Sequence, residues 1–170
     1  MPYKWYAIYT RSRYEKRVEK LLREEGVEVY LPLMRAFRRW SDRMKRVEVP
    51  LFNSYLFVRS DPSDQRHYYN ILQTPGVVRF ITFEGKPVPV PDHQVEALQR
   101  LSAEGYDLQP ADTPLTPGTP VEIKQGPLKG IRGEVLSTGG NKFLIIRLDV
   151  LDKNIRVSLP SGLVESTKDV

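Results

Sequence analysis

The stretch Pro50-Leu-Phe-Asn-Ser-Tyr-Leu-Phe-Val58 is nearly all apolar and decides how the first part of the chain folds. A regular strand would place Tyr55 and Phe57 on one face. Phe52 would join them only if Asn53-Ser54 made a kink or a bulge. The stretch is therefore either the buried central strand of a sheet or an aromatic surface patch that receives another protein, and its pattern alone leaves both interpretations open.

Upstream of this stretch, the sequence predicts a strand followed by an amphipathic helix. Residues 3–10 are rich in aromatic side chains, which is typical of a strand. Ser12 and Glu15 have the spacing of a capping box, with a hydroxyl at the cap and a glutamate three residues on, and Gly26 ends the helix. The apolar side chains of the helix recur on one face: Tyr14, Val18, Leu21 and Leu22.

Positive charge is concentrated in the first third of the 170-residue chain. Residues 1–49 contain 13 Lys and Arg against 7 Asp and Glu, whereas residues 50–170 contain 13 against 14. A basic surface suits a polyanionic partner, either nucleic acid or an acidic protein face, or it serves solubility alone. Four basic residues share helical spacing and lie opposite the apolar face of the predicted helix: Arg13, Lys16, Arg17 and Lys20.

A second basic segment lies between the strands predicted for residues 27–34 and 47–58. Residues 35–46 carry six basic residues and one acidic residue, with Phe37 and Trp40 among them. This composition predicts a solvated hairpin or loop.

Two further helices and a linker are predicted downstream. Asp61-Pro62 is expected to cap a helix that runs to about Gln73, a strand follows at residues 77–83, and a third helix runs from Asp92 to Gly105. Residues 106–116 form a proline-rich, semi-rigid interdomain linker in this interpretation. The domain boundaries are therefore 1–105 and 117–170.

The second predicted domain has a different sequence pattern. From Gly118 onward, short β-branched runs alternate with glycine-rich or polar turns, and no helical period appears. This pattern predicts a small five-stranded barrel.

The composition argues against several chemistries. With no cysteine, the chain forms no disulfide, zinc-thiolate site or thiol nucleophile. His67 and His93 are the only histidines, so a three-histidine metal site is excluded. We find no phosphate-binding glycine loop and no Gly-x-Ser-x-Gly elbow, and we expect neither an enzyme nor a cofactor. No apolar run approaches the roughly 18 residues of a membrane span, and no signal peptide is visible, so the cytoplasm is the expected compartment.

Four segments of the chain resemble the NusG family of transcription factors. Trp5-Tyr-Ala-Ile-Tyr9, the stretch from Pro50 to Val58 and Thr74-Pro-Gly-Val-Val-Arg-Phe80 are similar to three segments of the family's N-terminal domain. Residues 118–130, followed by Gly133-Glu-Val135, look like its C-terminal KOW motif. The residues that carry the KOW motif are Gly126, Pro127, Gly130 and Gly133. Ribosomal proteins also carry KOW motifs, so the order of all four segments is the stronger signal.

The resemblance implies a fold and an activity. The fold class would be an α+β N-terminal domain, an antiparallel sheet flanked by helices, followed by an SH3-like β-barrel. The N-terminal domain would dock on the clamp helices of the largest subunit of bacterial RNA polymerase and reduce pausing. The KOW domain would recruit termination factor Rho or a small-subunit ribosomal protein. The protein is expected to be a monomer and to bind no membrane. In relatives of the RfaH type the KOW segment can also adopt a helical hairpin.

Particular residues inherit roles from this resemblance. The matching positions for the hydrophobic depression that receives the clamp helices are Tyr9, Phe52, Tyr55 and Phe57. The residues matching the contact with the gate loop of the second-largest subunit are His67, Tyr68 and Tyr69. Upstream or non-template DNA would face the helix stripe and its neighbour: Arg11, Arg13, Lys16, Arg17 and Lys20. Phosphate contacts of this kind weaken steeply with salt.

The chain also departs from the common family pattern. Trp40-Ser-Asp-Arg-Met-Lys45 looks like the antiterminators of polysaccharide operons, the RfaH and UpxY types, and Asn53-Ser54 stands where the family often has proline-glycine. These details indicate a specialised antiterminator, with a housekeeping factor as the main alternative. From another class, a ribosomal or RNA-binding KOW protein would be expected to carry its basic residues in the barrel, whose charge is nearly balanced.

Overall fold

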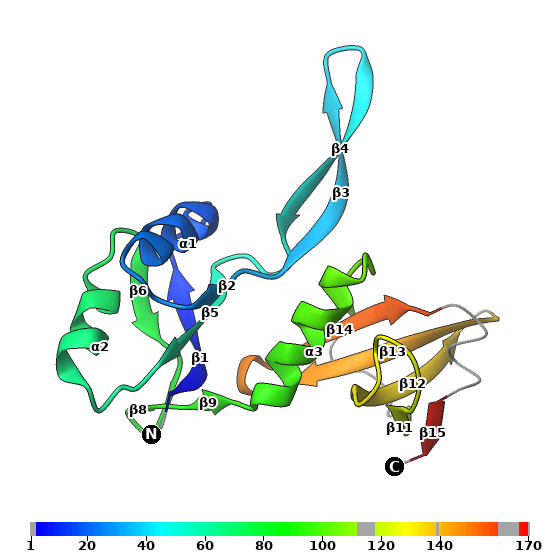
Figure 1. Ribbon diagram of the computed structural model, residues 1–170. Coiled ribbons are helices and arrows are strands. Elements are labelled where there is room, and N and C mark those ends of the chain that lie inside the picture. The colour runs from blue at the N-terminus through cyan, green and yellow to red at the C-terminus, as the bar shows by residue number, and fades with distance from the viewer. Residues whose placement is uncertain (1–2, 112–117, 139, 160–166, 170) are drawn as a thin grey trace. The chain divides into compact units, whose positions relative to one another are not determined.

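The structure is a computed structural model that describes residues 3–111, 118–138, 140–159 and 167–169 (Figure 1). The chain forms two compact units, Met1–Asp92 and His93–Val170. The fold class predicted from the sequence, an α+β unit followed by a β-rich unit, is confirmed.

The first unit is built on a five-stranded antiparallel sheet. Its strands lie in the order β2-β5-β1-β6, and β9 also pairs with β1. The elements of the unit are β1 (Lys4–Thr10), α1 (Glu15–Glu24), β2 (Val29–Tyr30), β3 (Leu33–Trp40), β4 (Arg43–Pro50), β5 (Tyr55–Ser60), α2 (Gln65–Leu72), β6 (Val77–Phe80), β7 (Thr82–Phe83), β8 (Lys86–Pro87) and β9 (Pro89–Val90). The stretch that begins at Pro50 thus supplies β5, an internal strand between β2 and β1.

One face of this sheet carries the hydrophobic core. Side chains alternate along a strand, so Leu56 and Val58 of β5 lie on one face and Tyr55 and Phe57 on the other. Leu56 and Val58 pack in a buried cluster with residues of both helices, including Val18 of α1. Both helices therefore cover the same face of the sheet, and the aromatic residues of β5 lie on the opposite one.

The start of α1 differs from the prediction. The N-cap is Tyr14, which makes no side-chain capping bond, and Arg13 precedes the helix with a φ of +68°. Glu15 does not reach back to Ser12, because its carboxylate is buried and accepts the backbone N–H of Ser54 at 2.7 Å. The predicted capping box is therefore wrong, since a partner 39 residues away in the sequence takes its carboxylate.

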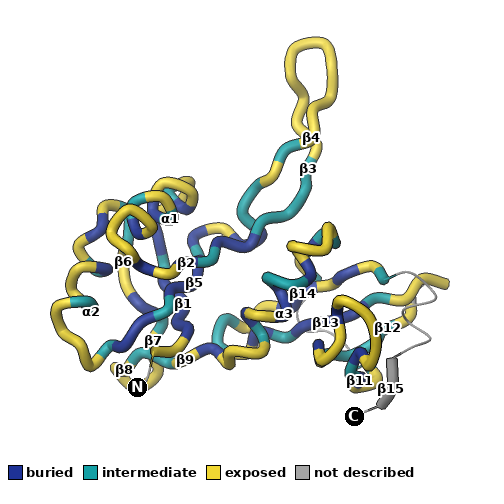
Figure 2. Tube along the Cα trace, in the orientation of Figure 1, coloured by how far each residue is buried: buried dark blue, intermediate teal, exposed yellow. Residues whose placement is uncertain are grey.

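Strands β3 and β4 form a two-stranded sheet of their own. The hairpin projects from the rest of the first unit, and its outer half is exposed (Figures 1 and 2). The solvated hairpin predicted for residues 35–46 is confirmed.

The second unit holds a six-stranded antiparallel sheet in the order β10-β14-β13-β12-β11-β15. Its elements are α3 (Asp92–Ala103), β10 (Gln109–Ala111), β11 (Thr119–Ile123), β12 (Arg132–Thr138), β13 (Asn141–Leu148), a short 3-10 helix η1 (Asp149–Leu151), β14 (Lys153–Ser158) and β15 (Thr167–Asp169). Strands β11 to β14 coincide with the β-branched runs of the sequence. Two short strands, β10 and β15, were not predicted.

The boundary between the units lies earlier than the predicted one at residue 105. Helix α3 lies in the second unit, where Nη2 of Arg100 donates to the carbonyls of Pro127 (2.8 Å) and Lys129 (2.7 Å). The first part of the predicted linker is also structured, because Leu108 is buried and β10 pairs with β14. Residues 112–117 of the predicted linker lie outside the described residues. A proline at position 110 suggested a linker, but an edge strand such as β10 tolerates proline.

Candidate functional site

The face of the first sheet opposite the helices is aromatic. Tyr9 lies directly across from Tyr55 in the pairing of β1 with β5, and their rings meet edge to face at 5.4 Å between centroids. One pair further on, Phe57 lies across from Ala7 and stacks on Tyr30 with centroids 6.3 Å apart. Three of the four residues predicted to form the docking patch, Tyr9, Tyr55 and Phe57, are thus on one face.

Burial separates the members of this predicted patch. Tyr9 and Tyr55 are half-buried, whereas Phe57 is 0% exposed. Phe52, the fourth predicted residue, is buried in the turn before β5, and this turn contains the kink that the prediction required, because Ser54 has a φ of +70°. Arg79 adds a cation to the patch, with Cζ 5.5 Å from the centre of the Tyr9 ring. The two tyrosines are therefore the accessible members.

The three residues predicted to contact a gate loop lie on α2 but have different surroundings. Tyr68 stacks on the buried Phe80 at 4.8 Å, and His67 meets Tyr3 edge to face at 5.7 Å. Tyr69 is exposed. Of the three, Tyr69 offers most of its ring to a partner.

The cap of α2 is Asp64 rather than the predicted Asp61. The side chain of Asp64 accepts the backbone N–H of His67 at 3.3 Å. Asp61 instead accepts both the N–H and the hydroxyl of Ser63, at 3.0 Å and 2.6 Å. The bond from the Ser63 hydroxyl is the main reason that the pKa of Asp61 lies below its usual range. Burial and the charge of Asp61 raise the pKa of the nearby Tyr6 hydroxyl.

The predicted basic stripe is exposed but is not one helical row. Arg11 and Arg13 precede α1, so only Lys16, Arg17 and Lys20 belong to the helix. Nζ of Lys16 donates to the carbonyl of Glu48 at 2.8 Å, which ties the helix to the base of the β3–β4 hairpin. The structure thus joins two basic segments that are separate in the sequence.

Three of the KOW residues, Gly126, Pro127 and Gly130, lie in the turn between β11 and β12, and Gly133 lies on β12. Gly126 and Gly130 have φ values of +79° and +92°, a region that favours glycine. Gly133 lies where a Cβ atom would come within 2.6 Å of the carbonyl oxygen of Ile145 on β13, so a larger residue would push the strands apart. Pro127, the fourth KOW residue, accepts the bond from Arg100 through its carbonyl. The positive φ values of Gly126 and Gly130 and the close approach of β13 to Gly133 explain why glycine occupies these three positions.

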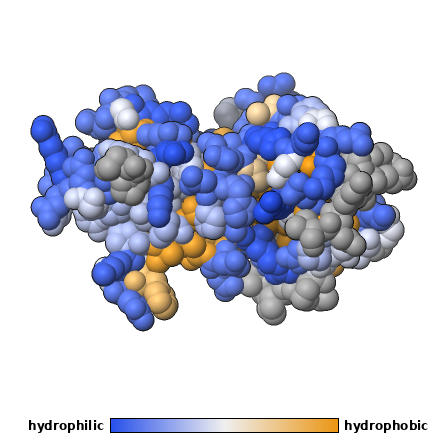
Figure 3. Space-filling model, turned by 60° about the horizontal axis from the view of Figure 1, so that its bottom comes forward, coloured by the Kyte–Doolittle hydropathy of each residue, from blue (hydrophilic) through white to orange (hydrophobic). Residues whose placement is uncertain are grey.

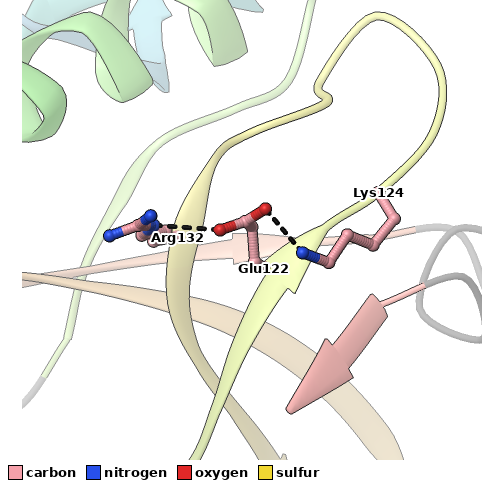
Figure 4. Close-up of polar contacts among 3 residues, drawn as sticks. All are labelled: Glu122, Lys124 and Arg132. Atoms are coloured by element: carbon pink, nitrogen blue, oxygen red, sulfur yellow. Dashed lines mark hydrogen bonds and ion pairs between the residues drawn. The ribbon is translucent and has the colours of Figure 1, made fainter. Parts of the chain in front are cut away.

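Ion pairs on the second sheet were not predicted. Glu122 of β11 lies between Lys124 and Arg132, at 2.7 Å and 3.0 Å (Figure 4). Hydrogen bonds from Lys124 and then Arg132 lower the pKa of Glu122. Arg147 of β13 forms a two-pronged pair with Glu134 and lowers the pKa of that carboxyl as well. Such pairs depend on strand register, which the sequence alone does not show.

The described part of the chain holds no group of three or more His, Cys, Asp or Glu side chains arranged to bind a metal ion. None of its helices is long and apolar enough to cross a membrane. The surface in the view of Figure 3 is largely hydrophilic, with small hydrophobic patches.

Comparisons with known proteins agree on one family. A family model described as "Transcription termination factor nusG" matches residues 3–99. The transcription termination/antitermination protein NusG of Staphylococcus carnosus is 27% identical over 175 residues, which cover 95% of this chain and 94% of that protein. The protein of the same name from Pseudomonas aeruginosa is 26% identical over 176 residues, covering 97% and 99%. A solved structure titled "Domain interaction in Thermotoga maritima NusG" is similar with a TM-score of 0.54 and 25% identity, covering 100% of this chain and 98% of that one.

Proposed function

Because the chain belongs to the NusG family of transcription termination and antitermination factors, we propose that it docks on the clamp helices of the largest subunit of bacterial RNA polymerase. The docking surface is the aromatic face of Tyr9, Tyr55 and Phe57, together with Phe52 in the turn before β5. Bound there, the protein suppresses pausing and premature termination. It acts as a binding factor and not as an enzyme.

The observation that carries this proposal is the half-buried Tyr9–Tyr55 pair on the sheet face opposite the helices. The helix face already has its partner in α1 and α2. Two amphipathic rings on the other face, held edge to face by neighbouring strands, suit the apolar side of a helical hairpin. Losing an interface aromatic of this kind costs about 2 kcal/mol or more, roughly thirtyfold in affinity.

Tyr55→Ala is the variant that tests the proposal. Because Tyr55 is half-buried rather than core, we expect its thermal melt to stay within a few degrees of wild type while polymerase binding and pause suppression fall about thirtyfold or more. Phe83→Ala is the matched control, since Phe83 is a 70% exposed aromatic on β7 that is not a member of the patch, and its loss should change neither property. A stable Tyr55→Ala protein that binds polymerase like wild type would place the docking surface elsewhere.

Two further contacts are part of the proposal. The gate-loop contact of His67, Tyr68 and Tyr69 rests mainly on Tyr69, because it is the exposed member. The basic residues around α1 would face upstream or non-template DNA. Alanine at Arg13, Arg17 and Lys20 should weaken crosslinking of the elongation complex to non-template DNA, and unchanged crosslinking would remove these residues from consideration.

The regulatory role has two candidates. The resemblance of residues 40–45 to polysaccharide-operon antiterminators favours action at particular operons. Near full-length similarity to proteins named for both termination and antitermination favours a general factor whose KOW segment recruits Rho or a ribosomal protein. Transcription of templates with and without a candidate operon leader, in the presence and absence of Rho, separates the two. A leader-dependent effect supports the first, and Rho-dependent termination on either template supports the second.

A further inference from the structure

The β3–β4 hairpin carries an unusual set of cross-strand neighbours. In its register Arg38 lies directly opposite Lys45, and the next outward pair on the same face is Trp40 opposite Arg43. Like charges directly opposite each other destabilise an antiparallel pair. Among the described residues, none brings a carboxylate within ion-pair distance of Arg38 or Lys45. An anionic partner would relieve this repulsion near the tip of the ribbon.

The same ribbon exposes large aromatic rings. Trp40 is 58% exposed and Phe37 is 68% exposed. Nζ of Lys45 lies 5.1 Å from the centre of the Trp40 ring, which leaves the cation and the ring available on one surface. Neither ring contributes to the core of the first unit. Trp40 shares one face of the exposed ribbon with Arg38 and Lys45, whereas Phe37 lies on the other face. A ring able to stack on a base therefore lies beside cations placed for a backbone of phosphates.

The base of the ribbon adjoins α1, and the cations it contributes there, Arg35 and Arg46, lie on the face opposite Trp40. An open hollow of about 580 Å³ is lined by Lys16 of the helix and by Arg35 and Arg46 of the hairpin, together with Val47 and Glu48. Lys16 holds the two elements together through the carbonyl of Glu48. Positive charge therefore runs from the helix to the tip of the hairpin, with Glu48 as the acidic member at its base.

We propose that the β3–β4 hairpin binds single-stranded nucleic acid, with Trp40 stacking on an unpaired base and the Arg38–Lys45 pair on the same face contacting phosphates. Stacking requires bases that are free of a duplex, so an exposed ring favours a single strand. The charge pattern alone would also suit an acidic protein, and the exposed Trp40 ring between cations favours unpaired bases, because every base offers a flat face on which the ring can stack. The site is separate from the Tyr9–Tyr55 patch, and its test does not depend on polymerase binding.

The test uses the full-length protein and a labelled 20-nucleotide oligothymidine, with binding followed by anisotropy and by tryptophan fluorescence. Trp5 is 1% exposed, so quenching on binding reports on Trp40. We expect quenching in wild type, and Trp40→Ala should bind roughly fivefold or more weakly, whereas Trp40→Phe should retain most of the affinity. A duplex of the same length should bind more weakly and quench less.

Arg38→Glu separates binding from folding. This change places a carboxylate opposite Lys45, so the hairpin gains an attractive pair and the thermal melt should not fall. Binding should nevertheless weaken, and the salt dependence of the affinity should become shallower by about 0.7 or more in the log–log slope. Lys86→Glu is the matched control, because Lys86 lies opposite an exposed aromatic, Phe83, in the small β7–β8 hairpin and should leave binding unchanged.

Three results would overturn the proposal. Equal affinity of wild type and Trp40→Ala, without quenching, would rule out stacking. Equal binding of polyglutamate and oligothymidine would make the ribbon a site for acidic proteins. Loss of binding in the Arg13, Arg17 and Lys20 triple alanine variant, with normal binding by Arg38→Glu, would move the site to α1. In none of these cases is the polymerase-docking proposal affected, since Tyr55 is tested separately.

Discussion

Replacing Glu15 with alanine is expected to lower the free energy of unfolding of the first unit by about 3 kcal/mol. Glu15 is 3% exposed, and its carboxylate accepts the N–H of Ser54 at 2.7 Å. A hydrogen bond to a charged group contributes about 1.5–3 kcal/mol, and a buried N–H left without a partner costs about 1–3 kcal/mol. Glu15 also lies in the first turn of α1, where a negative charge adds about 0.5 kcal/mol.

Glutamine at this position keeps an acceptor oxygen but loses the charge. A neutral hydrogen bond is roughly half as strong as a charge-assisted one, so Glu15→Gln should cost about 1 kcal/mol. The ranking of the two variants is therefore a sharper test than either magnitude.

Urea unfolding followed by Trp5 fluorescence measures this effect in the first unit. Trp5 is buried in β1, whereas the exposed Trp40 changes its surroundings little on unfolding. With a typical slope of about 1.5 kcal/mol per M urea, the midpoint should fall by about 2 M for Glu15→Ala and by less than about 1 M for Glu15→Gln.

Glu19→Ala is the matched control on the same helix. Glu19 forms an exposed ion pair with Arg23 at 3.1 Å, one turn further along, and such a pair contributes about 0.5 kcal/mol or less. If all three variants shift the midpoint equally, or Glu15→Ala does not shift it, the bond to Ser54 does not hold the turn before β5 and the reasoning is refuted.

Three shorter predictions concern the two units. Gly133→Ala should destabilise the second unit by about 1–3 kcal/mol, because the new Cβ would lie 2.6 Å from the Ile145 carbonyl oxygen, and an unchanged melt by circular dichroism would contradict this. Ser54→Gly should stabilise the first unit by about 0.5 kcal/mol, because glycine adopts the φ of +70° without strain and this gain outweighs its added freedom in the unfolded chain. A lower urea midpoint for this variant would show that the turn is unstrained. The folded pKa of Glu134 is depressed, chiefly by the hydrogen bond from Arg147, so its contribution is present above the unfolded pKa near 4.5 and is lost as pH falls through the folded value. Glu134→Gln should therefore flatten the fall of melting temperature as the pH is lowered below the unfolded pKa of Glu134, and an identical profile would show that the pair does not contribute.

The sequence correctly predicts the features that depend on short-range periodicity. Alternation along β5 places Tyr55 and Phe57 on one face and predicts that the other face packs on a helix, as it does. The composition of residues 35–46 likewise predicts an exposed hairpin. Both properties depend only on a period of two and on local charge.

What the sequence misses depends on partners that are distant along the chain. The Ser12–Glu15 capping box is wrong because Ser54 recruits the carboxylate. The sequence predicts helix α3 as part of the first domain, whereas the structure places it in the second unit. No pattern in the helix itself indicates that Arg100 donates to carbonyls of the β11–β12 turn. The sequence also does not show how deeply each residue of the docking patch is buried. Tyr55 and Phe57 share a face of the sheet, yet Tyr55 is half-buried and Phe57 is fully buried.

The length of the β3–β4 hairpin sets how far its tip lies from its base. Strands β3 and β4 each have eight residues, and at about 3.4 Å per residue the ribbon spans roughly 27 Å from base to tip. Because it makes its own sheet, its length can change without disturbing the core. Adding two residues to each strand would carry the tip about 7 Å further with the same side turned outward, while adding one would turn Trp40 to the reverse side. Homologous factors that act at different distances from their docking point could therefore diverge in ribbon length, in steps of two residues per strand.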